Sequence, residues 1–228
     1  MGEAGDYSRT HILDAPMLSR VQKAGPLNAL DVGCGEGRFC RMMSAHGIQT
    51  TGIDPTPQFL KTAMGKDTAG TYVQARGEDI PFEDASFDLV VSYLSLIDIE
   101  GFEEALAEMA RVLRPGGQLL IANLNSFITA LPDGVQNSGW IEDESGQRTH
   151  YGVDNYMKRR EAWTEWRGIK VLNYHRPLRD YMRVPLKLGL NLIDFEEPSP
   201  WRKGGPDGFE RDHSRVPFFV ITNWQKPD

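Results

Sequence analysis

The segment ALDVGCGEG, residues 29–37, is the strongest indication of the fold of this chain. It joins a short apolar run at residues 27–32 to a helical pattern at residues 37–46, so a strand passes into a helix at this point. Glycine lets the backbone turn sharply and lets a ligand approach the main chain closely. In a parallel α/β sheet, ligands bind beyond the carboxyl ends of the strands. The segment therefore predicts a ligand-binding turn.

Strands and helices alternate through most of the chain. Further strands are expected at residues 50–53, 71–75, 86–93, 118–123, 192–195 and 216–224. Helices are expected at residues 59–64, 102–114 and 178–188, and in the second of these, apolar residues recur at three- and four-residue spacing. This alternation indicates an α/β fold with a parallel sheet and right-handed crossovers. We expect one domain over residues 1–228, with residues 1–26 as an N-terminal helical cover.

The alternation fails over residues 125–183, which are crowded with aromatic side chains. Within this elaboration, residues 161–166 and 169–174 are expected to form an antiparallel hairpin around Arg167 and Gly168. Small-molecule sites are lined mainly by apolar and aromatic walls with few polar groups. We therefore expect the elaboration to build the pocket of a small-molecule substrate.

The composition excludes several classes of partner. The chain has 25 Lys and Arg against 32 Asp and Glu, a net charge of −7, which disfavours nucleic acid and anionic membranes. Cys34 and Cys40 are the only cysteines, too few for a disulfide framework or a four-cysteine zinc site, so no metal is expected. The start lacks a secretory signal pattern, and residues 115–132 are too short and polar for a membrane helix. A cytoplasmic location is expected, and the composition gives no indication of the oligomeric state.

Acidic residues follow two further strands. A carboxylate at Asp54 can accept both hydroxyl groups of a ribose, and Asp79 can accept from an exocyclic amine while Ile80 packs on an adenine ring. The glycine spacing departs from the dinucleotide fingerprint, because Arg38 stands where its third glycine belongs. This departure disfavours a nicotinamide or flavin dinucleotide.

With these motifs the chain resembles the class I S-adenosylmethionine-dependent methyltransferases, in the small-molecule subgroup called type 11. The resemblance rests on LDVGCGEG at 30–37, GID at 52–54, DIPF at 79–82, FDLVVS at 87–92 and LRPGG at 113–117. It implies a Rossmann-like, doubly wound, seven-stranded sheet of order 3-2-1-4-5-7-6 with the last strand antiparallel. It also implies S-adenosyl-L-methionine as cofactor, S-adenosyl-L-homocysteine as product and a small-molecule acceptor.

The resemblance also assigns residues to the cofactor. At the methionine end, Asp31 would contact the ammonium group, and a backbone carbonyl at Ser92 or Tyr93 would meet the same amine. Arg9 resembles a position that pairs with the cofactor carboxylate in some relatives. Asp54 would bind the ribose, and Asp79 and the backbone N–H of Ile80 would bind the adenine. The remaining expected cofactor contacts flank these positions: Gly33, Cys34, Gly35, Pro55, Thr56 and Glu78.

Catalysis needs little from the side chains, because a sulfonium already has a good leaving group and the enzyme mainly aligns the acceptor. A hydroxyl or ammonium acceptor still needs a general base. The candidates lie in segments that can overhang the sheet: His150, His175 and Tyr151, with Tyr174 and Asp98 as further possibilities. For any one histidine, a surface or core role is the more common one.

Two other functions stay open from the sequence. The chain can be a cofactor-binding partner subunit that has lost catalysis, since the segment before residue 27 is shorter than the cover of related chains. It can also be a nicotinamide-dependent oxidoreductase, which Arg38 disfavours. Residues 92–95 read Ser-Tyr-Leu-Ser and lack the Pro-Pro-aromatic motif of methylases that act on nucleobases or glutamine. Nucleic acid is therefore a minor alternative as substrate.

Overall fold

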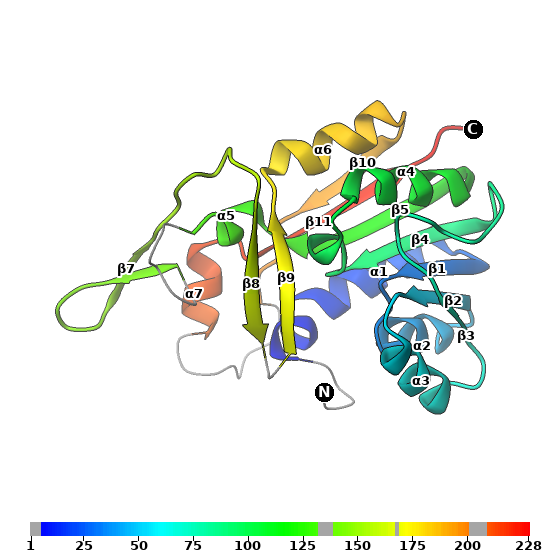
Figure 1. Ribbon diagram of the computed structural model, residues 1–228, viewed down its shortest axis with the longest axis horizontal. Helices are drawn as coiled ribbons and strands as arrows, with labels where there is room; N and C mark the ends of the chain where they lie inside the picture. Colours follow the sequence, from blue (N-terminus) through cyan, green and yellow to red (C-terminus); the bar gives the residue numbers. More distant parts are fainter. Residues whose placement is uncertain (1–5, 132–138, 167–168, 201–208) are drawn as a thin grey trace.

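The fold is built on one mixed sheet. The computed structural model describes residues 6–131, 139–166, 169–200 and 209–228. The sheet has seven strands in the order β10-β11-β5-β4-β1-β2-β3 (Figure 1). The strands are β1 (Asn28–Val32), β2 (Gln49–Asp54), β3 (Thr71–Gln74), β4 (Phe87–Tyr93), β5 (Leu113–Leu124), β10 (Asn191–Glu196) and β11 (Phe219–Gln225). The first five pair in parallel, and β11 runs antiparallel to both β5 and β10. The predicted strand order and antiparallel end are confirmed.

Helices cover both faces of this sheet. On one face, α4 (Phe102–Val112) and α6 (Leu178–Lys187) pack over β1, β4 and β5. On the other face lie the helical turn η1 (Arg9–Leu13), α1 (Asp14–Ala24) and α2 (Arg38–Ser44). One further helix, α3 (Pro57–Lys66), contacts β2 and β3. Strands buried on both sides explain the continuous apolar runs seen in the sequence.

The helix α4 shows how sequence pattern determines packing. Phe102, Leu106 and Met109 recur on one face and have no exposed surface. At its carboxyl end, Arg111 donates to the backbone carbonyls of Ile80 and Phe82, which ties the loop after β3 to this helix. The predicted strand start at residue 118 is wrong. β5 begins at Leu113, because Leu113 already pairs with Phe87 before the register shifts.

The elaboration consists of two hairpins. The two strands of the predicted hairpin are confirmed as β8 (Arg160–Trp166) and β9 (Ile169–His175), and its expected turn at Arg167 and Gly168 lies outside the described residues. The sequence interpretation missed a second hairpin of β6 (Trp140–Glu142) and β7 (Arg148–Tyr151), which projects from the body of the molecule in Figure 1. It also missed the short helices α5 (Ser126–Thr129) and α7 (Phe209–Arg215). Because β9 contacts η2 (Leu96–Asp98), the turn after β4, the β8–β9 hairpin crosses the carboxyl edge of the sheet.

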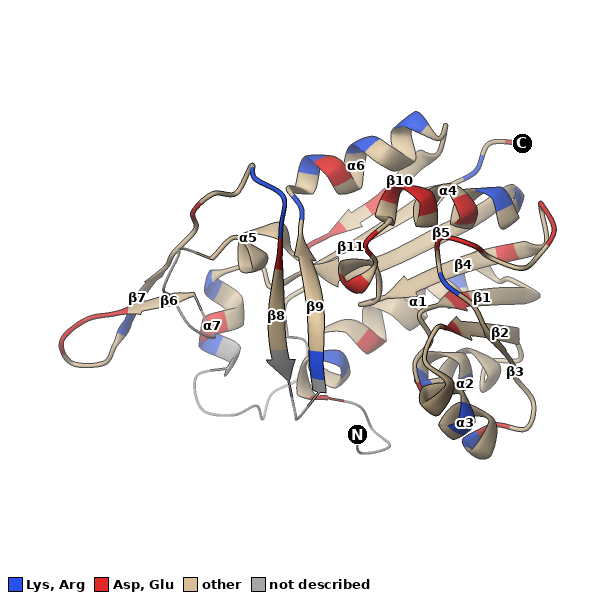
Figure 2. Cartoon of the chain, viewed as in Figure 1, with Lys and Arg blue, Asp and Glu red and all other residues tan. Residues whose placement is uncertain are grey.

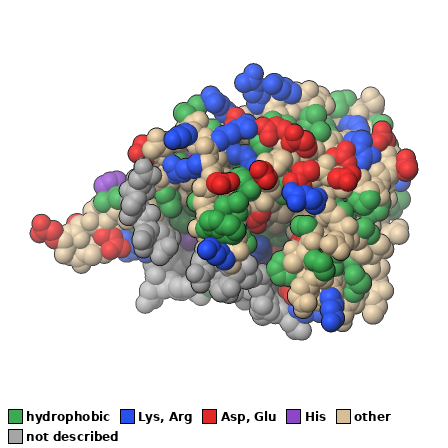
Figure 3. Space-filling model, in the orientation of Figure 1, with side chains coloured by type: hydrophobic (Ala, Val, Ile, Leu, Met, Phe, Trp, Pro, Cys, Tyr) green, Lys and Arg blue, Asp and Glu red, His purple; other side chains and the backbone are tan. Residues whose placement is uncertain are grey.

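The surface carries mixed charge on the face shown. Acidic and basic residues are interspersed along α4 and α6 (Figure 2), and hydrophobic side chains lie among both kinds on the same face (Figure 3). Among the described residues, no helix has both the length and the apolar character that a membrane span requires.

Candidate functional site

The glycine turn after β1 has two packed positions and one open position. Gly33, Gly35 and Gly37 adopt φ angles of 75°, 55° and 74°. A Cβ atom added at Gly33 would lie 2.3 Å from Ser95 Cβ, and one added at Gly37 would lie 2.5 Å from Tyr72 Oη. At Gly35 the added atom would meet nothing within 4 Å. Gly33 and Gly37 therefore serve close packing, whereas Gly35 faces the space where a ligand can approach the backbone.

Asp54 at the end of β2 is held beside that open glycine. Its carboxylate accepts from the backbone N–H of Gly35 at 2.9 Å and from that of Thr56 at 2.8 Å. The side chain is 7% exposed. The neighbouring carbonyl of Pro55 accepts from Gln74 Nε2 at 3.3 Å, which ties the end of β2 to β3. Each carboxylate oxygen keeps a further lone pair, so Asp54, which these contacts hold in place, can still accept hydrogen bonds from hydroxyl groups of a ligand.

Asp31 presents an unsatisfied carboxylate oxygen next to the same turn. The residue is 2% exposed, and its Oδ1 atom has no hydrogen-bond partner among the described residues. Its Oδ2 atom lies 3.5 Å from the thiol of Cys40. Burial raises the pKa of Asp31 to about 7, assisted by the charge of Asp54 and opposed by Cys40 and Arg9. A cation beside Oδ1 would satisfy this buried acceptor.

The N-terminal helices are fixed to the site by a buried polar network. Asp14 accepts two hydrogen bonds from Arg38 and one from the Tyr93 hydroxyl at 2.8 Å. Arg9 pairs with Asp6, and its guanidinium carbon lies 5.8 Å from the centre of the Tyr93 ring. The sequence interpretation missed this role of Arg38, because no motif links residue 38 to residue 14. The expected cofactor residues Arg9 and Tyr93 thus lie together at the carboxyl end of β4.

The ends of β1 and β4 are locked together below the turn. Ser92 is fully buried, and its hydroxyl lies 2.8 Å from the Ser95 hydroxyl. Ser95 in turn donates to the carbonyl of Val32 at 2.5 Å. Cys34 is 8% exposed and packs where a Cβ atom at Gly52 would otherwise lie. These contacts keep the strand tips in a fixed relation.

The expected adenine residues lie in the loop after β3. Asp79 is exposed, and its N–H donates to the carbonyl of Arg76 at 3.2 Å. Glu78 pairs with Arg76 at 2.9 Å. The backbone N–H of Ile80 donates to Glu108 Oε2 at 3.0 Å, so the expected contact with a ring nitrogen would have to replace this hydrogen bond. Ile80 itself is buried, so it contributes to the core beneath this loop.

Two of the three candidate bases are engaged in structural contacts. His175 is 4% exposed, with Nδ1 2.7 Å from Thr129 Oγ1 and Nε2 2.9 Å from the carbonyl of Tyr156. Burial lowers the pKa of His175, so the ring is held neutral and both nitrogens are in use. The Tyr151 hydroxyl donates to the carbonyl of Ile128, and burial raises its pKa to about 12. These contacts speak against His175 and Tyr151 as bases.

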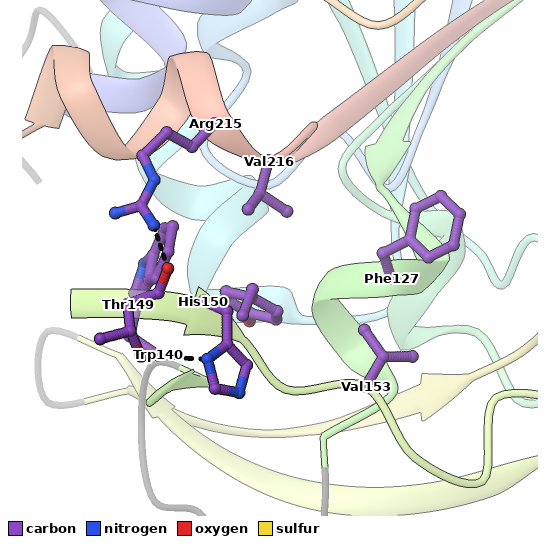
Figure 4. A pocket seen from close by; sticks show the side chains of 8 residues that line it. Phe127, Trp140, Thr149, His150, Val153, Arg215 and Val216 are labelled. Carbon is purple, nitrogen blue, oxygen red and sulfur yellow. Dashed lines mark hydrogen bonds between the residues drawn. The ribbon is translucent and has the colours of Figure 1, made fainter. Parts of the chain in front are cut away.

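His150 lies in a separate pocket of about 350 Å³ between the β6–β7 hairpin, α5 and α7 (Figure 4). Arg215 of α7 donates to the carbonyls of Arg148 and Thr149 and stacks 4.6 Å from the Trp140 ring, which holds the hairpin against the helix. The pocket is lined by Phe127, Trp140, Thr149, His150, Tyr151, Val153, Arg215 and Val216. None of these lining residues belongs to the glycine turn.

Comparison with known families gives one match over the first half of the chain. Residues 30–121 match the family model described as methyltransferase domain. This range begins in β1 and ends in β5, so it includes the glycine turn, Asp54 and the loop after β3.

Curated relatives match about half of the chain. Malonyl-[acyl-carrier protein] O-methyltransferase from Enterobacter lignolyticus is 36% identical over 108 residues, which cover 47% of this chain and 43% of the relative. O-methyltransferase resE from Aspergillus sclerotiorum is 37% identical over 113 residues, which cover 46% of this chain and 43% of that relative. The match therefore spans less than half the length of these curated relatives.

Solved structures match nearly the whole chain. A protein from Listeria monocytogenes, named as a candidate S-adenosylmethionine-dependent methyltransferase, is similar with a TM-score of 0.80. It is 28% identical, and the match covers 94% of this chain and 98% of that one. An S-adenosylmethionine-dependent methyltransferase from Mesorhizobium loti also has a TM-score of 0.80, with 24% identity and coverage of 99% and 100%. The latter likeness concerns the fold alone.

Proposed function

We propose that this chain is an S-adenosylmethionine-dependent methyltransferase that transfers a methyl group to a small molecule, which the match of residues 30–121 to a methyltransferase domain supports. The observation that carries the proposal is the grouping of Gly35, Asp54 and Asp31 at adjoining strand tips. The grouping offers an open backbone approach, a fixed hydroxyl acceptor and an unsatisfied buried carboxylate. A nucleoside with a cationic amino-acid tail needs these three features.

The residues that would hold the cofactor form three groups, at its methionine end, its ribose and its adenine. Asp31 would face the ammonium group, with Arg9 and the backbone of Ser92 or Tyr93 at the same end. Asp54 would bind the ribose hydroxyls with its remaining lone pairs, beside Gly33, Cys34, Gly35, Pro55 and Thr56. Glu78, Asp79 and Ile80 would border the adenine. When bound, S-adenosylmethionine supplies a methyl group on a good leaving group.

The rest of the chain would align the acceptor and exclude water. The segment before residue 27 is anchored through Asp14, and the β8–β9 hairpin crosses the carboxyl edge beside η2. In this proposal both would cover the reacting groups. We propose a small-molecule acceptor because the names of the curated relatives describe O-methyltransferases. The cytoplasmic location and the exclusion of nucleic acid stay predictions from composition.

Calorimetry with two ligands separates this function from its alternatives. We expect S-adenosylhomocysteine to bind the purified chain and NADH not to bind. Binding of NADH alone would support an oxidoreductase and contradict the proposal. Radiolabelled S-adenosylmethionine with a panel of metabolites then tests transfer. Tight cofactor binding without transfer to any metabolite would favour a partner subunit without catalysis.

Replacing Asp54 with alanine is expected to weaken binding of S-adenosylhomocysteine by about 2 kcal/mol, roughly 30-fold, because the ribose hydroxyls lose charged partners. Calorimetry measures the loss. Asp84→Ala provides a matched control, because Asp84 is 78% exposed and pairs with Arg111 at the end of α4. Equal affinities for Asp54→Ala and the control would remove Asp54 from the ribose site.

A further inference from the structure

Asp98 lies one helical turn beyond Ser95, the residue that packs beside Gly33 of the glycine turn. It ends η2, the turn that directly follows β4. η2 is anchored at Ser95, whose hydroxyl donates to the carbonyl of Val32 and whose Cβ atom occupies the space beside Gly33. The N–H of Asp98 donates to the carbonyl of Ser95 at 2.9 Å. Asp98 is therefore placed at the carboxyl edge, on the β4 side of the proposed cofactor site.

The β8–β9 hairpin fixes the position of this carboxylate. Asn173 of β9 donates from Nδ2 to Asp98 Oδ1 at 2.5 Å. Arg176, directly after β9, is 4% exposed and donates to the carbonyls of Leu96, Ile99 and Glu100 at 3.3, 2.5 and 2.9 Å. Hydrogen bonds from one end of the hairpin thus hold both the backbone of η2 and one carboxylate oxygen of Asp98.

The second oxygen of Asp98 is available to an incoming molecule. In the described ranges, no hydrogen bond or ion pair reaches Oδ2, and the side chain is exposed to solvent. Partial burial of the carboxyl group by the surrounding protein raises the pKa of Asp98 to about 6. The hydrogen bond from the Asn173 amide and the charge of Arg9 act in the opposite direction and lower this pKa. A base with such a pKa is ionised at neutral pH and still accepts a proton readily.

We propose that Asp98 accepts the proton that the acceptor loses during methyl transfer, so that the acceptor is an O–H or N–H group and not a carboxylate. This inference rests on the proposed function. A lone pair of the acceptor forms the new bond to the methyl carbon, and the methyl–sulfur bond breaks with its electron pair passing to sulfur. The proton passes to Oδ2 of Asp98. A carboxylate has no proton to lose and would be repelled by Asp98.

Asn173 and Arg176 are positioning residues in this scheme. Arg176 holds the η2 backbone, and Asn173 orients the carboxylate so that Oδ2 faces outward. Because the Asn173 amide stabilises the ionised form, Asn173→Ala should raise the pKa of Asp98. A merely structural role for Asn173 would leave that pKa unchanged.

A titration of the carboxyl group tests the charge state without turnover. Carboxyl ¹³C resonances of aspartate-labelled protein are followed with pH in the presence of S-adenosylhomocysteine. We expect one resonance to titrate near pH 6, to be absent in Asp98→Asn, to persist in Glu100→Gln and to move upward in Asn173→Ala. Titration of Asp98 near the ordinary value of 3.8 would overturn the assignment.

A transfer assay with three matched probes tests the acceptor class. Phenol, benzylamine and benzoate share a ring and differ in the reacting group. With radiolabelled S-adenosylmethionine, we expect label on phenol or benzylamine, and the labelled probe distinguishes an oxygen from a nitrogen acceptor. Asp98→Asn should lower that rate about 100-fold. Glu100→Gln, a neutralised carboxylate two residues away, should retain the rate.

The outcomes separate this inference from the proposed function. If wild-type protein does not bind S-adenosylhomocysteine in calorimetry, the proposed function fails. If binding is normal but no probe or metabolite is labelled, the proposed function fails as well. If binding is normal, and equal in Asp98→Asn, two results would each overturn the inference alone. They are label on benzoate but on neither phenol nor benzylamine, and an undiminished rate in Asp98→Asn. Thermal unfolding of Asp98→Asn and Asn173→Ala confirms that each variant is folded.

Discussion

Replacing Gly35 with valine is expected to abolish binding of S-adenosylhomocysteine, with a loss of affinity of more than about 1,000-fold, or 4 kcal/mol. The added side chain would project into the open space beside the turn, where a Cβ atom meets nothing within 4 Å. Because this space is where a ligand would meet the backbone of Gly35, valine and the ligand cannot occupy it together. Calorimetry measures the loss.

Gly25→Val controls for the cost of backbone strain. Gly25 ends α1 with a φ of 59°, close to the 55° of Gly35, and an added Cβ atom there also meets nothing within 4 Å. Both variants therefore carry the same strain of a β-branched residue in the left-handed region. They should unfold at similar temperatures, and only Gly35→Val should lose the ligand. Wild-type affinity in folded Gly35→Val would refute the position of the site.

Much of the fold follows from periodicity and from glycine. Apolar runs bounded by turn residues marked the strands of the sheet, and the repeat of Phe102, Leu106 and Met109 marked α4. The β6–β7 hairpin was missed because its strands are short and lack an apolar alternation. Its only local signal is the turn at Asp143 and Gly146, where Asp143 accepts from backbone N–H groups and Gly146 has a φ of 80°.

The candidate site was predictable where chemistry coincides with a strand end. Asp31, Asp54 and the glycine turn follow from such positions. The side chains that support them do not, because Asp14 and Arg38, or Asp98 and Asn173, meet only through tertiary packing. Residue type and the position of its segment also suggested His175 as a base. Its two hydrogen bonds show that a histidine in the right segment can serve packing instead.

Binding of S-adenosylhomocysteine is expected to weaken about tenfold for each pH unit below 7, and Asp31→Asn should remove this dependence. In the free protein the pKa of Asp31 is about 7, so below pH 7 the carboxyl is protonated and neutral. An ammonium group favours the ionised form, so binding at low pH must first release the proton. Calorimetry at pH 5, 6, 7 and 8 measures the slope and the proton release.

At pH 7.5 the loss of the buried charge pair should cost Asp31→Asn about 3 kcal/mol of binding free energy, more than 100-fold in affinity. Glu36→Gln serves as the control, because Glu36 lies on the same turn and pairs with Lys66 of α3. It should keep the slope with pH. If the affinity of Asp31→Asn still changed with pH as in wild type, a group other than Asp31 would be responsible for the pH dependence.

The same substitution should stabilise the protein without ligand. The folded pKa of about 7 exceeds the ordinary value of 3.8 because burial penalises the charged form. Between these values the folded state keeps a proton that the unfolded chain has released, so the free energy of unfolding falls as pH rises, by up to about 1.4 kcal/mol per unit. At pH 8, Asp31→Asn avoids that loss and should melt at a higher temperature than wild type. A gain in stability together with a loss of affinity would identify Asp31 as a residue that serves binding and lowers stability. A lower melting temperature of Asp31→Asn than of wild type at pH 8 would contradict the presence of a buried, uncompensated charge at Asp31.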